Sequence, residues 1–249
     1  MMAAVNAPLN IMGIVGIRSG SKGVPDKNIR PLAGKPLVGW ILDAASKSKY
    51  LNRIVVSTDS EAYAAIAKSY GADVPYLRPA ELAADDSPEY EYVRHMVEWL
   101  ERNEGYRPDI VVRMMATVPL QSTQDIDAVI RTLLDDPKAD SAVAIAEARQ
   151  HPMKALKLVE DGDGGKKLVS YFSESGREVT PIARQGYEKA YFRANIIGCR
   201  RRVIFETNSL TGDLVRPHII PQNRAVDIDN EIDFYMVEHL LQSLPQSKR

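Results

Sequence analysis

Residues 10–28 read NIMGIVGIRSGSKGVPDKN, and this stretch decides the fold of the chain. The apolar run Ile11–Ile17 predicts a buried β-strand, and a polar, glycine-containing loop follows it without a break. In α/β proteins, ligands bind just beyond the carboxyl ends of the buried strands. The stretch therefore indicates an α/β fold with a binding site directly after the first strand.

The loop over residues 18–28 has the composition of a polyphosphate-binding loop. Three cations, Arg18, Lys22 and Lys27, stand against a single acid, and two glycines allow the backbone to approach an anion closely. The spacing fits neither the Walker A pattern nor GxGxxG. A solvated basic turn is the alternative, but the position after the first apolar strand favours phosphate binding.

Composition excludes several classes of function. The 249 residues are 45% hydrophobic and 26% charged, as in globular proteins, and we expect a single domain over residues 1–249. A net charge of −1 offers no general attraction to nucleic acid or to a membrane surface, and no apolar run is long enough to span a bilayer. The lone Cys199 cannot form an internal disulfide, and residues 1–10 lack the pattern of a secretory signal. We therefore expect a cytoplasmic protein that binds neither nucleic acid nor membranes.

Strand-like and helix-like segments alternate along most of the chain. Such alternation predicts right-handed crossovers and a doubly wound, mostly parallel sheet of the Rossmann-like α/β class. The strand ends would bring Ser57–Ser60 and Thr117–Thr123 to the edge that carries the 18–28 loop. The predicted strands are Ile11–Ile17, Arg53–Ser57, Val74–Leu77, Asp109–Met115, Ser141–Ala146 and Ala194–Cys199, and the predicted helices are Leu37–Ser48, Glu61–Tyr70, Pro88–Asn103, Thr123–Leu134 and Glu231–Leu244.

Residues 150–192 differ from the rest in being richer in charge, glycine and turn residues. The DGDGG run at Asp161–Gly165 predicts a hairpin or loop. We interpret this region as an inserted, β-rich arm that extends the sheet or makes a subunit contact.

A second motif, VDIDNEIDF at Val226–Phe234, carries a pair of carboxylates. In an extended segment, Asp227 and Asp229 point to the same side and repel each other unless a cation lies between them. Mg²⁺ prefers one or two carboxylates together with phosphate oxygens. The pair therefore predicts a nucleotide–metal site opposite the loop, although Asp229 or Asn230 could also simply cap the last helix.

Several motifs, in order along nearly the whole chain, resemble the acylneuraminate cytidylyltransferases, the family of the CMP-sialic acid synthetases. They are RSGSKGVPDKN, VSTDS at Val56–Ser60, RPAELA at Arg78–Ala83, HPMK at His151–Lys154, FRAN at Phe192–Asn195, and the late VDID element.

The resemblance implies transfer of CMP from CTP to the anomeric hydroxyl of a nonulosonic 2-keto sugar acid, with release of pyrophosphate. It also implies Mg²⁺ as cofactor and a homodimer whose inserted arms reach into the partner's site. Arg18, Lys22 and Asp227 would be catalytic, and Asp227 and Asp229 would bind the metal. The other implied nucleotide- and substrate-binding residues are Ser19, Gly20, Ser21, Gly23, Lys27, Asn28, Arg78, Met115, Lys154, Arg184, Gln185, Arg193 and Asn195.

The sequence departs from the family pattern after the Asp109–Met115 run. Met115 stands where the family has Gln, and Val118 stands where it has Ser. Loss of an amide removes a group that both donates and accepts hydrogen bonds, and such groups set substrate specificity. A nucleotidyltransferase for another base, such as GTP, or for another sugar therefore remains an alternative. A non-catalytic nucleotide-binding module is the second alternative.

Overall fold

The structure is a computed structural model and describes residues 8–21, 23–84, 86–172 and 186–243. Of the predicted site residues, Lys22, Arg184 and Gln185 lie outside the described residues. Within these ranges, no helix combines the length and the apolar character that crossing a membrane requires.

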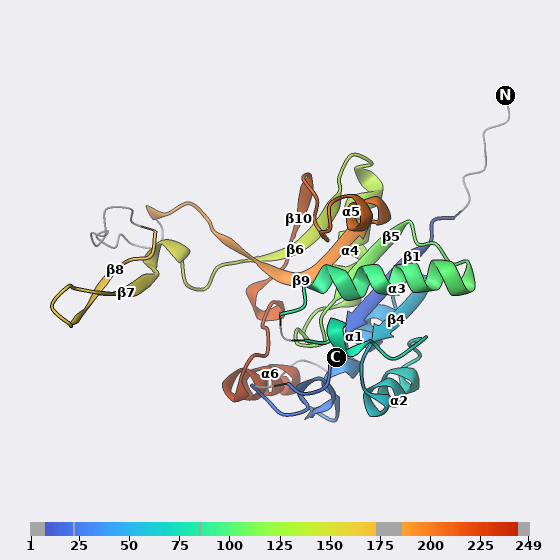
Figure 1. Cartoon of the computed structure of the whole chain (residues 1–249), viewed down its shortest axis with the longest axis horizontal. Helices are drawn as coiled ribbons and strands as arrows, with labels where there is room; N and C mark the ends of the chain where they lie inside the picture. The colour runs from blue at the N-terminus through green and yellow to red at the C-terminus, as the bar shows by residue number, and fades with distance from the viewer. Residues whose placement is uncertain (1–7, 22, 85, 173–185, 244–249) are drawn as a thin grey trace.

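A six-stranded sheet in the order β10-β6-β9-β5-β1-β4 forms the centre of the fold (Figure 1). β1 is parallel to both of its neighbours, β4 and β5, and β10 is parallel to β6. β9 runs antiparallel between β5 and β6. The predicted doubly wound, mostly parallel sheet is therefore confirmed. The strands are β1 (Ile11–Gly16), β4 (Arg53–Ser57), β5 (Ile110–Met114), β6 (Ser141–Glu147), β9 (Tyr191–Arg200) and β10 (Val215–Ile219).

One predicted strand is wrong. Val74–Leu77 is irregular, and only its neighbour Asp73 makes an isolated bridge, to Val55 of β4. Pro75 lies inside the run and has no N–H to donate to a ladder, which explains why pairing stops there. β10 was not foreseen, because its sequence, VRPHI, is largely exposed and contains a proline.

Helices cover both faces of the sheet. Residues of α1 (Leu37–Ser46), α2 (Glu61–Ser69) and α4 (Thr123–Asp135) share one apolar cluster with one face. Residues of α3 (Glu89–Glu104) and α5 (Arg201–Glu206) share a second cluster with the other face. α3 lies across the front of the sheet in Figure 1. This three-layer arrangement leaves the carboxyl ends of β1, β4 and β5 at a common edge.

The last helix, α6 (Glu231–Ser243), packs against a third apolar cluster beside that edge. Its buried residues are Phe234, Val237 and Leu241. The same cluster contains Val226 and Ile228, which alternate with the two aspartates of the VDID element. Burial of these two side chains therefore fixes the position of the aspartates. Two short strands, β2 (Pro31–Leu32) and β3 (Lys35–Pro36), complete this corner.

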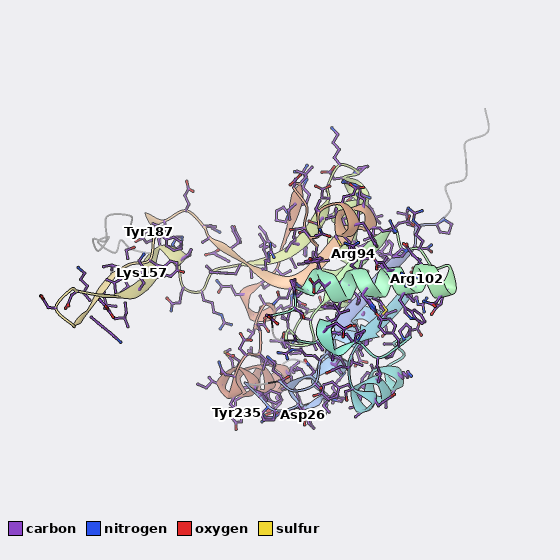
Figure 2. All side chains as sticks on the ribbon, viewed as in Figure 1. Asp26, Arg94, Arg102, Lys157, Tyr187 and Tyr235 are labelled. Carbon is purple, nitrogen blue, oxygen red and sulfur yellow. The ribbon has the colours of Figure 1, made fainter. Side chains whose placement is uncertain are left out.

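The inserted region forms an arm that projects from the body (Figure 1). β7 (Leu156–Glu160) and β8 (Lys166–Ser170) pair only with each other, as an antiparallel hairpin. The DGDGG run closes it, and the Asp161 carboxylate accepts hydrogen bonds from two loop N–H groups, as predicted for a turn. In Figure 2, Lys157 and Tyr187 lie together on this arm, well apart from Asp26 and Tyr235 on the body.

Candidate active site

The loop after β1 is held by a carboxylate at the end of β4. The backbone N–H and the hydroxyl of Ser19 both donate to Asp59, over 2.8 Å each. Burial opposes the charged form of Asp59, but these two hydrogen bonds outweigh it and hold the pKa of the carboxyl below its ordinary value. At the far end of the loop, the amide of Asn28 donates to the backbone oxygen of Arg18 over 3.1 Å. The first and last residues of the loop are thus drawn together.

The predicted contact between the loop and the VDID element is present in the structure. A Cβ atom added to Gly23 would lie 2.5 Å from the backbone oxygen of Asp229, so only glycine fits there. The ammonium of Lys27 donates to the backbone oxygen of Ile228 over 2.5 Å and lies 3.8 Å from the Asp229 carboxylate. Segments two hundred residues apart therefore form one surface. Gly20 has a φ of 71°, in the left-handed region that favours glycine.

Asp227 is the most unusual carboxylate of this surface. Its Oδ2 atom accepts a 2.7 Å hydrogen bond from the amide of Asn195, and its Oδ1 atom is buried without a hydrogen-bond partner. Burial raises the pKa of Asp227 above its ordinary value. The nearby Thr117 hydroxyl opposes this rise, although it makes no hydrogen bond of normal geometry, and the like charge of Asp229 adds to it.

This arrangement fits a divalent cation. An orphaned, buried carboxylate oxygen gains a partner when a metal binds, and the metal's charge also removes the repulsion between Asp227 and Asp229. The Asp229 side chain is 79% exposed, so a cation can reach it from solvent. Within the described residues there is no cluster of three or more metal-binding side chains. Two protein carboxylates match the coordination preference of Mg²⁺, which takes its other ligands from phosphate and water.

Arg78 lies behind the loop and is largely occupied. It is buried and donates to the hydroxyl and the backbone oxygen of Ser57, over 2.9 and 2.6 Å. Its guanidinium stacks over the Tyr92 ring, 4.3 Å from the ring centroid. Burial lowers the pKa of Arg78, and the like charge of Arg18 lowers it further. Arg78 therefore supports the edge of the site, with Arg18 near enough to act on it electrostatically.

Of the residues predicted to face a sugar acid, the structure describes Lys154, Arg193 and Asn195. Lys154 lies in a 3₁₀ turn, η3 (Pro152–Lys154), at the start of the arm, and Arg193 is exposed on β9 where the arm returns. Asn195 is different, because its amide contacts Asp227. Ser21 is half-buried in the loop, and Met115 is half-buried immediately after β5.

Residues 12–211 match the family described as cytidylyltransferase. The chain belongs to this cytidylyltransferase family. It is therefore a nucleotidyltransferase. The resemblance to the acylneuraminate cytidylyltransferases that the sequence motifs indicate is confirmed.

Two relatives match this cytidylyltransferase over nearly their whole length. Post-translational flagellin modification protein B of Campylobacter coli is 33% identical over 93% of this chain and 94% of its own. CMP-N,N'-diacetyllegionaminic acid synthase of Campylobacter jejuni is 30% identical over the same shares, 93% and 94%. The solved structure of a CMP:2-keto-3-deoxy-manno-octonic acid synthetase complexed with CTP shares the fold. Its TM-score is 0.67 at 16% identity, and the match covers 94% of this chain and 100% of that one.

Two residues that contact the segments of the candidate site escaped the sequence analysis. Asp59 was noticed only as part of a polar strand end, and nothing in sequence shows that it receives both donors of Ser19. Arg113 lies inside β5, and its signal was available: a charged residue interrupts the apolar run DIVVRMM.

Proposed function

We propose that this cytidylyltransferase transfers CMP from CTP to the anomeric hydroxyl of a nonulosonic 2-keto sugar acid and releases pyrophosphate. The observation that carries the proposal is the contact between the cationic loop and the carboxylate pair, made through Lys27 and Gly23. Relatives named N-acylneuraminate cytidylyltransferase and CMP-N,N'-diacetyllegionaminic acid synthase support the choice of substrates.

The reaction is an in-line displacement at the α-phosphorus. The anomeric oxygen attacks, and the bond to the β-phosphate oxygen breaks as pyrophosphate leaves. Catalysis of such a step rests on positioning and on neutralising charge that develops on the phosphate oxygens. Arg18, Lys22 and Lys27 supply the positive charge of the loop. The Ser19–Asp59 contact keeps the loop in place, so that little reorganisation is needed during the reaction.

Asp227 and Asp229 would hold Mg²⁺, with Asp227 offering its orphaned Oδ1 atom. The metal would supply additional positive charge at the phosphates. Burial raises the pKa of Asp227, and a bound cation would favour its ionised form.

We propose that the sugar acid is bound between two copies of the chain. Lys154 and Arg193 lie at the two ends of the arm, and Arg184 and Gln185 belong to the same inserted segment of the sequence. A guanidinium matches a substrate carboxylate in two-point geometry. A homodimer would bring the arm of one copy to the nucleotide of the other. The arm carries many exposed apolar side chains that such an interface would cover: Met153, Leu156, Leu158, Leu168, Tyr171, Phe172, Tyr191 and Phe192.

We place the enzyme in the cytoplasm, where CTP is available.

Label transfer tests the reaction directly. CTP labelled at the α-phosphorus is incubated with the enzyme, Mg²⁺ and a panel of nonulosonic acids, and products are separated by anion-exchange chromatography. The proposal expects the α-label in a CMP-sugar. In a parallel reaction with CTP labelled at the γ-phosphorus, it expects the label in pyrophosphate. Appearance of the α-label in pyrophosphate or in free CMP alone would contradict it. Asp227→Asn is the control for background chemistry, and it should give no labelled sugar.

A further inference from the structure

Arg113 is a charged side chain inside a fully buried strand. Every residue of β5 is buried, and Arg113 is only 3% exposed. Its Nη2 atom lies 2.6 Å from the Glu89 carboxylate at the start of α3, and its Nη1 atom donates to the backbone oxygen of Asn195 over 3.2 Å. Its Nε atom is buried without a partner. The guanidinium therefore connects α3 to β9 across the end of β5.

Stability does not explain this arrangement. Moving a guanidinium out of water is costly, and replacing a buried ion pair by apolar side chains of similar volume is often neutral or stabilising. Arg113 lies on the same face of β5 as Val111, which belongs to the apolar cluster of α3. The unpartnered Nε atom adds to the cost. A contact made by the arginine must therefore serve another purpose.

The partner of Arg113 is a strained residue at a bulge. The register of β9 against β6 shifts between Val143 and Ile145, and Asn195 lies opposite this shift. Asn195 has a φ of 63°, in the left-handed region that a non-glycine residue keeps only when its surroundings hold it. Bulges of this kind redirect side chains next to active sites.

Two side chains hold the bulge by donating to the backbone oxygens of two consecutive residues. Gln121 donates to the backbone oxygen of Ala194, and Arg113 donates to the backbone oxygen of Asn195. With both oxygens held, the Asn195 amide points at Asp227 and donates to it over 2.7 Å. A continuous chain of contacts thus runs from Glu89 through Arg113 and Asn195 to the carboxylate of Asp227.

We infer that Arg113 is a positioning residue that acts through the backbone of Asn195 to orient Asp227 for the divalent metal. This inference rests on the proposed role of Asp227. Outer-shell partners of metal ligands typically affect metal affinity or activity 10- to 100-fold. Arg113 therefore sets the Mg²⁺ concentration at which the enzyme works, although it touches neither metal nor substrate.

The test compares Arg113→Leu, Asn195→Ala and the double variant. The readouts are the Mg²⁺ concentration for half-maximal activity and Mn²⁺ binding, followed by electron paramagnetic resonance, in the presence of CTP and without sugar acid. We expect each single variant to need about 10-fold more metal, and the double variant to lose no more than Asn195→Ala alone. Arg113→Lys, which keeps a donor, should recover part of the affinity. Arg201→Leu removes another Arg–Glu contact to α3, with Glu101, and is the matched control with unchanged metal dependence.

Unchanged metal affinity in Arg113→Leu, or a loss that adds to that of Asn195→Ala, would overturn the inference. If Arg113→Leu does not fold, Glu89→Gln gives the same test from a side chain that is 45% exposed, with a smaller expected loss. Failure of the proposed function has a different signature, because Asp227→Asn would then bind Mn²⁺ as the wild type does.

Discussion

The backbone oxygen of Asp229 lies where a side chain at Gly23 would have to be, 2.5 Å from an ideal Cβ position. Gly23 belongs to the cationic loop, and Asp229 to the segment that carries the carboxylate pair. Their contact sets the spacing between the two halves of the proposed nucleotide site. That spacing decides whether one triphosphate and one metal can touch both halves at once.

Gly23→Ala should separate the two halves by forcing the backbones apart. Misplacement of this kind can cost on the order of 100-fold in activity, and we expect a loss of about 10- to 100-fold in kcat/KM for CTP. Gly105→Ala is a suitable control, because Gly105 ends α3 with a φ of 65° and lies away from the loop. That variant should lower the melting temperature while leaving KM unchanged. Equal kcat/KM values for CTP in wild type and Gly23→Ala would show that the contact does not set the spacing.

Asp59 should make CTP binding sensitive to acid. Its pKa is held below the ordinary value in the folded protein, so the ionised form, which accepts both donors of Ser19, is lost only as pH falls through that lowered value. The contribution of Asp59 to loop order is therefore complete at neutral pH and disappears at strongly acidic pH. Asp59→Asn replaces one of the two oxygens that accept from Ser19 by an NH2 group, which can only donate, and it should raise KM for CTP about 5- to 10-fold at neutral pH.

The pH dependence of KM for CTP, measured in wild type and Asp59→Asn, distinguishes these cases. Wild type should show a rise in KM toward acid that the variant does not share. A parallel rise in both proteins would assign the dependence to another group.

Asp227→Asn should separate stability from function. The pKa of Asp227 is raised in the folded state, so folding favours the protonated carboxyl. Ionisation therefore destabilises the metal-free fold as pH rises through the raised pKa. Asparagine removes this charge, and in EDTA at neutral pH we expect a gain on the order of 1 kcal/mol, or about 2–4 °C. Mg²⁺ with CTP should raise the melting temperature of wild type only. Lower stability of the variant in EDTA would contradict the account of Asp227.

The arm predicts a concentration-dependent dimer. Leu158 and Leu168 face each other across the β7–β8 hairpin and are 66% and 60% exposed. Leu158→Asp with Leu168→Asp should give monomers in light scattering and at least a 10-fold lower kcat/KM for the sugar acid, because charged groups are depleted from interface cores. Leu9→Asp, at a residue that is 44% exposed near the start of the described chain, should remain dimeric and active. A fully active double variant that is monomeric would remove the arm from the site.

The sheet and the main site segments could be predicted because apolar and polar runs alternate sharply. Ile11–Ile17 is almost wholly buried, and the polar residues after it begin where β1 ends. The short segments could not be predicted. Val74–Leu77 has the composition of a strand, but Pro75 prevents pairing, and β10 pairs although its side chains are exposed.

Side-chain partners were harder to predict than the backbone. The last helix was correctly placed, but its buried face contains Phe234, whereas Ile232 is 77% exposed. Apolar residues occur around the whole helix, so periodicity alone does not select one face. The proposal for Asp227 could be made from its spacing with Asp229. Its contact with Asn195 depends on a bulge in β9, and register shifts of this kind leave no sequence pattern.

A nucleotide panel tests the central claim most directly. Pyrophosphate release is measured with each of the four nucleoside triphosphates, in the presence of Mg²⁺ and a panel of nonulosonic acids and amino sugars. Because Met115 and Val118 replace polar residues of the family pattern, this measurement bears on the part of the site that the loop and the aspartates do not decide. The account predicts release with CTP and a nonulosonic acid together, and none when either is omitted. Release with GTP and not with CTP, or with an amino sugar and no sugar acid, would contradict it.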